Sequence, residues 1–183
     1  LPSTYIHLVG GASLAVGDIL IAVIPRGGLD LQISIADVVT GNPKITGLGP
    51  TAGTISDARI LTFKIIGASL FVGAGGELSN DFTTIVADGA VGFLIDGASF
   101  TMVSVSKNTT SFTAMSIGLN NVALLGIDGF TLGVSHATFK LNKTSVVGGP
   151  RIDWSHATTA PSTPENLLPA LDIDSGMDVE VAG

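Results

Sequence analysis

Apolar and polar side chains alternate along several short stretches of the chain, with the period of two that is typical of a β-strand with one buried face. The pattern is clear over Leu29 to Ile35, over Ile60 to Ile66 and at the end of Phe130 to Leu141. No window carries an apolar stripe of helical period without glycines inside it. The pattern therefore predicts an all-β protein.

One strand of the pattern is apolar on both sides. Phe100 and Met102 fall on one face of the predicted strand, whereas Val103 and Val105 fall on the other. Such a strand either contains a β-bulge or is covered on both faces. Cover on both faces would also account for the high apolar content of the chain.

Turn signals separate the predicted strands. Tyr5 to Ile24 predicts two strands broken near Gly17-Asp18, and the glycine- and proline-rich run Thr40 to Asp57 predicts a long loop. Between Phe82 and Leu141 the separators are dipeptides that tolerate positive φ and are typical of hairpins, which predicts antiparallel neighbours. These are Asp88-Gly89, Asp96-Gly97, Lys107-Asn108, Asn120-Asn121 and Asp128-Gly129.

A short motif, Gly-Ala-Ser followed by a large apolar residue, recurs along the chain. It begins at Gly11, Gly67 and Gly97, and a looser copy begins at Gly129. A period near 30 residues is typical of stacked supersecondary units that cannot bury their apolar faces alone. We therefore predict an antiparallel repeat array, either β-solenoid-like or an extended two-layer sheet. Its approximate units are 5–40, 60–90, 91–125 and 126–154, with a C-terminal loop and closing strands over 155–183.

Composition narrows the choice of partners. Of the 183 residues, 45% are apolar and only 13% are charged, so most of the chain must be covered by itself or by neighbours. The formal charge is −7 and the basic residues are scattered singly, which makes nucleic acid an unsuitable partner. The chain contains no Cys, so it has neither disulfides nor thiolate metal ligands.

The apolar run from Ile6 to Pro25 raises the question of a membrane span. Gly10, Gly11 and Asp18 interrupt the run, and no basic segment precedes it. We expect two buried strands here and no membrane span.

Two groups of aspartates are candidate Ca²⁺ ligands, because carboxylates in aligned turns can supply the oxygens that this ion prefers. The first group comprises the aspartates of the Asp-Gly turns, Asp88, Asp96 and Asp128, and the second comprises Asp172, Asp174 and Asp178. Tight hairpins and a solvated acidic turn are the alternatives, since neither a nonapeptide calcium repeat nor an EF-hand spacing is present.

Few other residues are candidates for ligand binding or catalysis. Trp154, the single tryptophan, is either a sugar-stacking platform or an aromatic cap over the end of a β core. Ser135-His136, and Ser155-His156 with Asp153 nearby, hold the residue types of a nucleophilic triad. Neighbours on a strand point to opposite faces, however, so these pairs are not expected to bond. No other catalytic cofactor or active site is indicated, and we expect no enzyme.

Three parts of the chain resemble modules of very large repetitive bacterial cell-surface proteins, of the adhesin-like kind with a LEPR-XLL-type leader. They are Phe93 to Val103, the block Leu119 to Lys140, and the segment Arg151-Ile152-Asp153-Trp154. The resemblance spans roughly Ile65 to Gly183, and the loop-rich Thr40 to Asp57 departs from it. It implies an elongated β array at the cell surface or in a secreted matrix, with a structural or adhesive role.

We therefore expect an extracellular structural or adhesive module that self-assembles end to end or edge to edge into a filament or surface layer. Its expected partners are other copies of itself or adjacent modules. The alternative is a glycan- or ice-binding β domain, calcium-dependent or not, whose partner is a surface glycan or ice. A regular row of threonines or aromatics would favour that alternative, and no convincing row is present.

Overall fold

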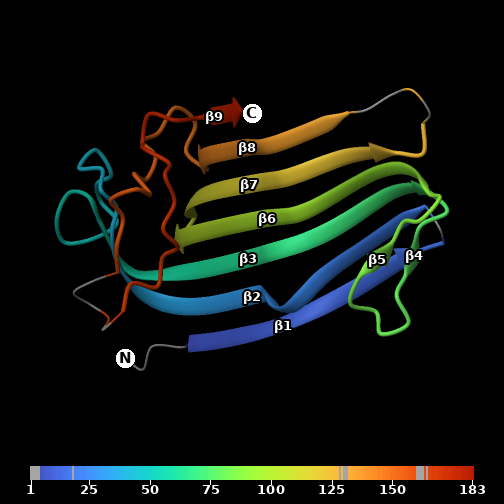
Figure 1. Ribbon diagram of the computed structural model, residues 1–183. Coiled ribbons are helices and arrows are strands. Elements are labelled where there is room, and N and C mark those ends of the chain that lie inside the picture. The colour runs from blue at the N-terminus through green and yellow to red at the C-terminus, as the bar shows by residue number, and fades with distance from the viewer. Residues whose placement is uncertain (1–4, 18, 128, 130–131, 160–162, 164) are drawn as a thin grey trace.

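The computed structural model describes residues 5–17, 19–127, 129, 132–159, 163 and 165–183. Seven strands form one large antiparallel sheet in the order β1-β2-β3-β6-β7-β8-β9 (Figure 1). These strands are β1 (Tyr5–Val16), β2 (Leu20–Val39), β3 (Thr54–Ala74), β6 (Val91–Lys107), β7 (Thr110–Leu125), β8 (Gly133–Thr144) and β9 (Val179–Ala182). A separate small hairpin pairs β4 (Glu77–Leu78) with β5 (Ile85–Val86).

The all-β, antiparallel prediction is confirmed, because each strand of the large sheet pairs antiparallel with its neighbours. The sheet is open, with β1 and β9 at its edges, and the described residues form no solenoid coil. No helix of the described chain is long and apolar enough to cross a membrane.

Two of the predicted turns lie inside strands instead of between them. Asp96-Gly97 falls within β6 and Asn120-Asn121 within β7, so these strands run on for 17 and 16 residues. By contrast, Lys107-Asn108 does begin a hairpin, because Lys107 pairs with Thr110 and Asn108 has a φ of 53°. Asp88-Gly89 forms a turn that leads from β5 into β6. Asp128 lies outside the described residues.

The recurring Gly-Ala-Ser motif coincides with β-bulges. Gly67 and Gly97 have φ values of 69° and 71°, and the register between β3 and β6 shifts on both sides of the pair Ala68 and Ala98. The register between β1 and β2 likewise shifts between Gly10 and Ala12. A bulge bends a strand without ending it. The motif therefore marks where the long strands bend.

An end cap, defined as the described residues of 40–53 and 145–178, covers one end of one sheet face (Figure 1, left). Its side chains Ile45, Ile152, Trp154 and Ile173 are buried against apolar residues of β2, β3, β6 and β7. The run Thr40 to Asp57 thus forms a packed loop for most of its length, and its last residues begin β3.

The β4–β5 hairpin covers the other end of the same face. Beneath it, Phe71 of β3 is fully buried together with Ile21 of β2 and Ala90. Residues that pair across antiparallel strands share a face, and counting through the bulges places Phe71 on the same face as the core residue Ile60. Both covers therefore lie on one side of the sheet, and the described chain places no cover on the other side.

Candidate functional site

The aspartates of the Asp-Gly turns do not meet in one place. Asp88 is exposed in its turn, whereas Asp96 lies in the bulge of β6 and its Oδ1 accepts a hydrogen bond of 2.7 Å from the Oγ of Ser69. Asp96 therefore ties two bulged strands together. Asp128, the third predicted ligand, lies outside the described residues.

The C-terminal aspartates are also engaged separately. Asp172 pairs with Lys140 at 3.2 Å, and Asp178 pairs with Lys143 at 2.6 Å. The Oδ1 of Asp174 accepts hydrogen bonds from the backbone N–H groups of Gly176 and Met177. Within the described residues, no three His, Asp or Glu side chains are grouped so that they could hold a metal ion. The predicted calcium ligands thus gain no geometric support.

Trp154 is only 2% exposed, so its indole offers no face to a sugar. It packs in the core beneath the end cap. This corrects the sequence-based proposal of a stacking platform, and the reason is that the segment around Trp154 folds back over the sheet. The alternative of an aromatic cap over the β core describes its position.

Ser155, His156 and Asp153 are brought together, contrary to the argument from strand geometry, because they lie in a turn. The Nδ1 of His156 is 3.1 Å from the Oγ of Ser155 and 3.0 Å from the Oδ2 of Asp153. Both partners meet the same ring nitrogen, whereas a serine triad uses one nitrogen for Ser and the other for Asp. The hydroxyl of Ser155 also lies 2.5 Å from the Oδ1 of Asp153. The cluster therefore stabilises a local turn.

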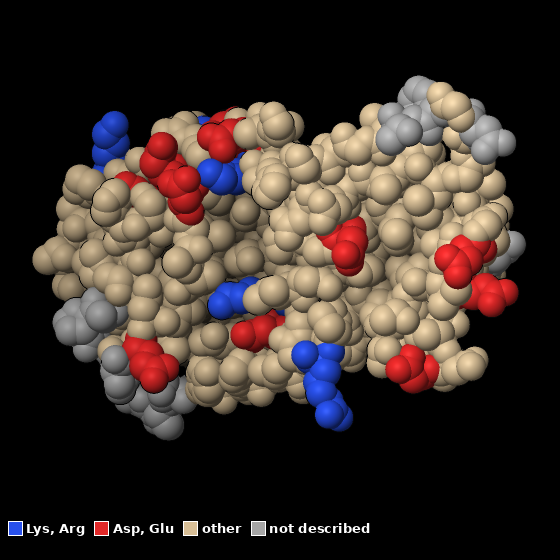
Figure 2. Space-filling view, viewed as in Figure 1, with Lys and Arg blue, Asp and Glu red and all other residues tan. Residues whose placement is uncertain are grey.

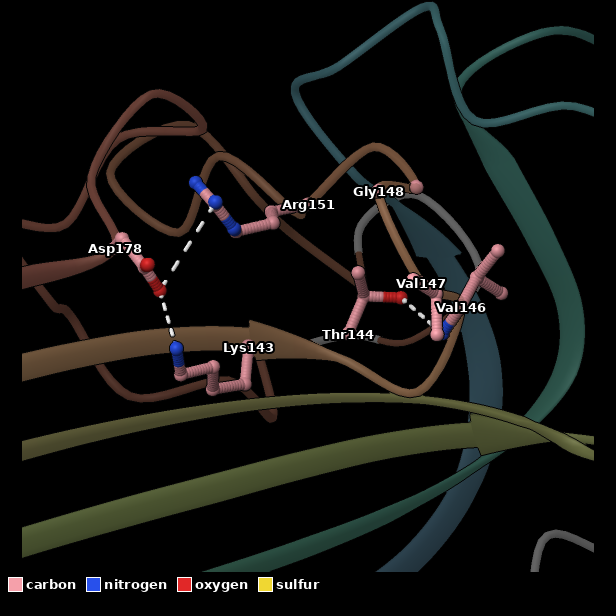
Figure 3. Close-up of a pocket in the computed structure, with 8 residues that line it drawn as sticks. Lys143, Thr144, Val146, Val147, Gly148, Arg151 and Asp178 are labelled. Carbon is pink, nitrogen blue, oxygen red and sulfur yellow. Dashed lines mark hydrogen bonds and ion pairs between the residues drawn. The ribbon is translucent and has the colours of Figure 1, made fainter.

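A hollow of about 230 Å³ lies where β8 meets the end cap (Figure 3). Asp178 stands between Lys143 and Arg151, and the Lys143 ammonium holds the pKa of this carboxyl below its usual range. Arg151 Nη1 also donates to the carbonyl oxygen of Met177 at 3.0 Å. Because Lys143 and Arg151 are both paired within the chain, we interpret the hollow as part of the contact between the end cap and β8.

A polar row crosses the face of the sheet between the two covers. Lys140 joins this row to β9 and to the end cap, since it pairs with Glu180 of β9 at 3.1 Å and with Asp172 at 3.2 Å. The hydrogen bond to Glu180 raises the pKa of Lys140. Charged side chains on this side are scattered and form no single patch (Figure 2). The row consists of Asp30, Lys64, Thr101, Ser116, Lys140 and Glu180.

Strand β1 forms a long open edge of the sheet, and its only strand partner among the described residues is β2. It has 12 residues and contains no Lys, Arg, Asp, Glu or Pro. Its apolar side chains are exposed, with Leu8, Val9 and Leu14 each 54% accessible. The apolar run from Ile6 to Pro25 predicted two buried strands; the first strand is present but exposed, because it lies at an edge of the sheet, and only the strand order reveals this.

The opposite edge is formed by β9 and by the part of β8 that β9 does not reach. β9 has four residues and pairs only with Thr138 to Leu141 of β8, so that residues 133–137 of β8 have no strand partner on that side among the described residues. Glu180 stands in the middle of β9. Short edge strands and edge charges are devices that discourage further pairing. The two edges are therefore unequal, and β1 is the better template for another strand.

Comparison of the chain with protein-family models, with curated proteins and with solved structures finds no match. The resemblance to repetitive cell-surface proteins stays a prediction. The candidate functional features are therefore two surfaces defined by geometry, namely the open edge of β1 and the uncovered face of the sheet.

Proposed function

We propose that the protein is a structural and adhesive module that works outside the cell and joins other copies of itself through its sheet. The observation that carries this proposal is the open edge of β1, which is long, free of Lys, Arg, Asp and Glu, and paired on one side only. Composition supports the same role, since a chain with 13% charged residues lacks the polar coat of a free-standing domain.

Edge pairing has a simple physical basis. Half of the backbone N–H and C=O groups of an edge strand point away from the sheet, and another extended strand can satisfy them. Two copies related by a two-fold axis would place their β1 strands side by side and antiparallel. Such a contact is isologous, because each copy contributes the same surface. It would create one sheet continuous across two copies.

Substitution of the β1 edge tests the function. Val9 and Ser13 lie on the edge with exposed side chains, so Val9→Lys with Ser13→Lys adds charge there without disturbing a core. We expect the wild-type chain to form multimers visible by light scattering and electron microscopy, in which the β1 amides that point away from β2 are protected from hydrogen exchange. The double variant should lose both properties, since like charges would face each other across the new strand pair.

A matched control adds the same charge elsewhere. Asn80→Lys with Val147→Lys places two lysines on exposed positions far along the chain from β1, and should leave assembly unchanged. Unprotected outward-pointing β1 amides in the wild-type chain at high concentration would overturn edge pairing. Equal loss of assembly in both double variants would show that only net charge matters.

A further inference from the structure

The uncovered face of the sheet is an apolar surface that crosses every strand. Its rows follow from the pairing register, because partners across antiparallel strands point to the same side. Four rows contain no polar or charged side chain. They are Leu8-Leu31-Phe63-Met102-Met115-Leu141-Val179, Gly10-Leu29-Ile65-Phe100-Ile117-Phe139-Val181, Leu14-Ala22-Leu70-Ile95-Val122-Val134 and Val16-Leu20-Val72-Phe93-Leu124. We call these four rows the apolar face.

The sequence distinguishes the apolar face from the strip of the opposite side that lies open between the two covers. Met102 lies in the apolar face, and its neighbour Thr101 lies in the polar row on the opposite side. The same alternation relates Met115 to Ser116. In an antiparallel sheet with one wet face, polar residues lie on the wet side. By this criterion the polar row faces solvent and the apolar face belongs against another surface.

Nothing in the described chain supplies that surface. No residue of the apolar face is among the buried residues of either core cluster. At its margins Leu14, Phe93 and Val181 are 54%, 44% and 76% exposed. Near its centre Phe63 and Phe100 make an edge-to-face contact with ring centroids 5.8 Å apart.

We propose that the apolar face packs against the apolar face of a second copy, giving a two-layer sandwich. Strands spaced about 4.8 Å apart and rising about 3.3 Å per residue give this seven-stranded region about 1,000 Å² on each copy. The two copies together would thus bury about 2,000 Å² of surface, which is at the lower end of the range for stable homodimers. Two sheets packed in this way lie about 10 Å apart.

The chemistry of the face suits a second copy. An isologous interface must be complementary to itself, and a surface without charges meets this condition with no like-charge contact. Arg59 and Lys143 pair in or beyond the row of Leu61 at one end of the face, and Arg26 lies in the bulge of β2 between the rows of Leu29 and Ala22. Met102 and Met115 lie side by side at the centre, and their flexible side chains can adapt to a partner sheet.

Packing of the apolar faces deepens the proposed function, on which its biological meaning rests. It adds a contact between sheet faces to the contact between β1 edges. Face packing leaves both β1 edges of the sandwich open. Edge pairing alone joins two copies, whereas edge pairing and face packing together allow growth beyond two. A filament or layer would then be two sheets thick.

The test separates the two contacts. All variants carry Val9→Lys with Ser13→Lys, so that β1 edges do not contribute. In this background Met102→Glu with Met115→Glu should convert a dimer into a monomer, with a dissociation constant raised by at least about 100-fold. Thr101→Glu with Ser116→Glu places the same residues one position away on the wet face, near Lys64 and Lys140, and should leave the dimer intact. Sedimentation equilibrium measures the mass, and fluorescence of buried Trp154 verifies folding.

Each outcome decides whether the apolar face binds a second copy of the chain or a different partner. A folded monomer in the edge-blocked background would overturn the two-copy sandwich and assign the face to an adjacent module or another partner. A dimer that survives Met102→Glu with Met115→Glu would overturn the face as the contact. Neither result depends on the edge, because the proposed edge pairing is judged separately by protection of β1 amides in the chain with native Val9 and Ser13.

Discussion

The indole Nε1 of Trp154 donates a hydrogen bond of 3.0 Å to the Oδ1 of Asn142, and both side chains are buried. The same amide uses its Nδ2 to donate to the carbonyl oxygens of Ile152 and Asp174, at 2.9 and 2.8 Å. Asn142 therefore fastens β8 to two separate passages of the end cap. A buried amide with its partners satisfied is a specific tie, because any loss of one partner leaves polar groups without water.

Replacing Asn142 with Ala should destabilise the protein strongly. The change leaves the indole N–H of Trp154 and two backbone carbonyls without their partner, at a cost of about 1–3 kcal/mol for each buried group that stays unpaired. We expect the free energy of unfolding to fall by about 3 kcal/mol. Denaturant titration followed by the fluorescence of Trp154, the single tryptophan, measures it at fixed protein concentration. The exposed Asn80→Ala should change the midpoint little, and equal losses in both variants would contradict the tie.

Contact between Gly76 and Phe71 fixes the position of the β4–β5 hairpin. A Cβ atom built on Gly76 would overlap the ring of Phe71, which is fully buried and cannot swing into solvent. Gly76→Val should therefore lower the free energy of unfolding by about 1–3 kcal/mol through overpacking. It should also raise hydrogen exchange at the hairpin amides, because the hairpin must lift from the sheet.

Gly133→Val is the matched control for this substitution. A Cβ atom at Gly133 has no heavy atom within 4 Å, and its φ is not in the left-handed region. We expect a stability change within about 0.5 kcal/mol. Equal exchange at the hairpin in wild type and Gly76→Val would show that the hairpin does not depend on this close contact.

Acid should weaken the turn around Asp153. Burial raises the pKa of this carboxyl, but hydrogen bonds from Ser155 and His156 outweigh it, so that the pKa is lowered overall. A group whose folded pKa is depressed contributes stability above its unfolded pKa, which is about 3.9 for Asp. That contribution is lost as the pH falls through the folded pKa.

Asp153→Asn removes the titrating carboxyl and should flatten the stability curve below about pH 4. The variant should be less stable than wild type at neutral pH, and the two curves should converge in strong acid. Ser155→Ala removes one hydrogen bond and should give an intermediate slope. Denaturant titrations at several pH values measure these slopes, and identical slopes for wild type and Asp153→Asn would refute the assignment.

Local sequence could not decide whether Asp-Gly ends a strand. Asp88-Gly89 and Asp96-Gly97 are the same dipeptide, yet the first forms a turn and the second lies in a bulge of β6. Glycine provides the positive φ in both places. The outcome depends on whether a neighbouring strand continues past the glycine, and β3 does so opposite Asp96-Gly97. That information is non-local.

The candidate site shows the same limit. The candidate aspartates were chosen by their spacing in the sequence. In the structure, the described aspartates that have a partner bind different ones, such as Ser69 for Asp96 and Lys143 for Asp178. Ser155 and His156 meet because their segment turns, which a strand pattern did not predict. Adjacency of side chains from distant segments depends on how loops return to the sheet, and no local pattern encodes it.

The sequence by itself determined the β character of the chain and the two faces of its strands, because side chains alternate with a period of two in any strand. Apolar residues on both sides of the strand at Phe100 and Val103 indicated either a β-bulge or cover on both faces. Only the tertiary structure decided which face is covered within the chain, that β1 stands at an edge, and that Trp154 is buried. These features depend on strand order and on the return of the end cap, which are set by contacts between residues far apart in sequence.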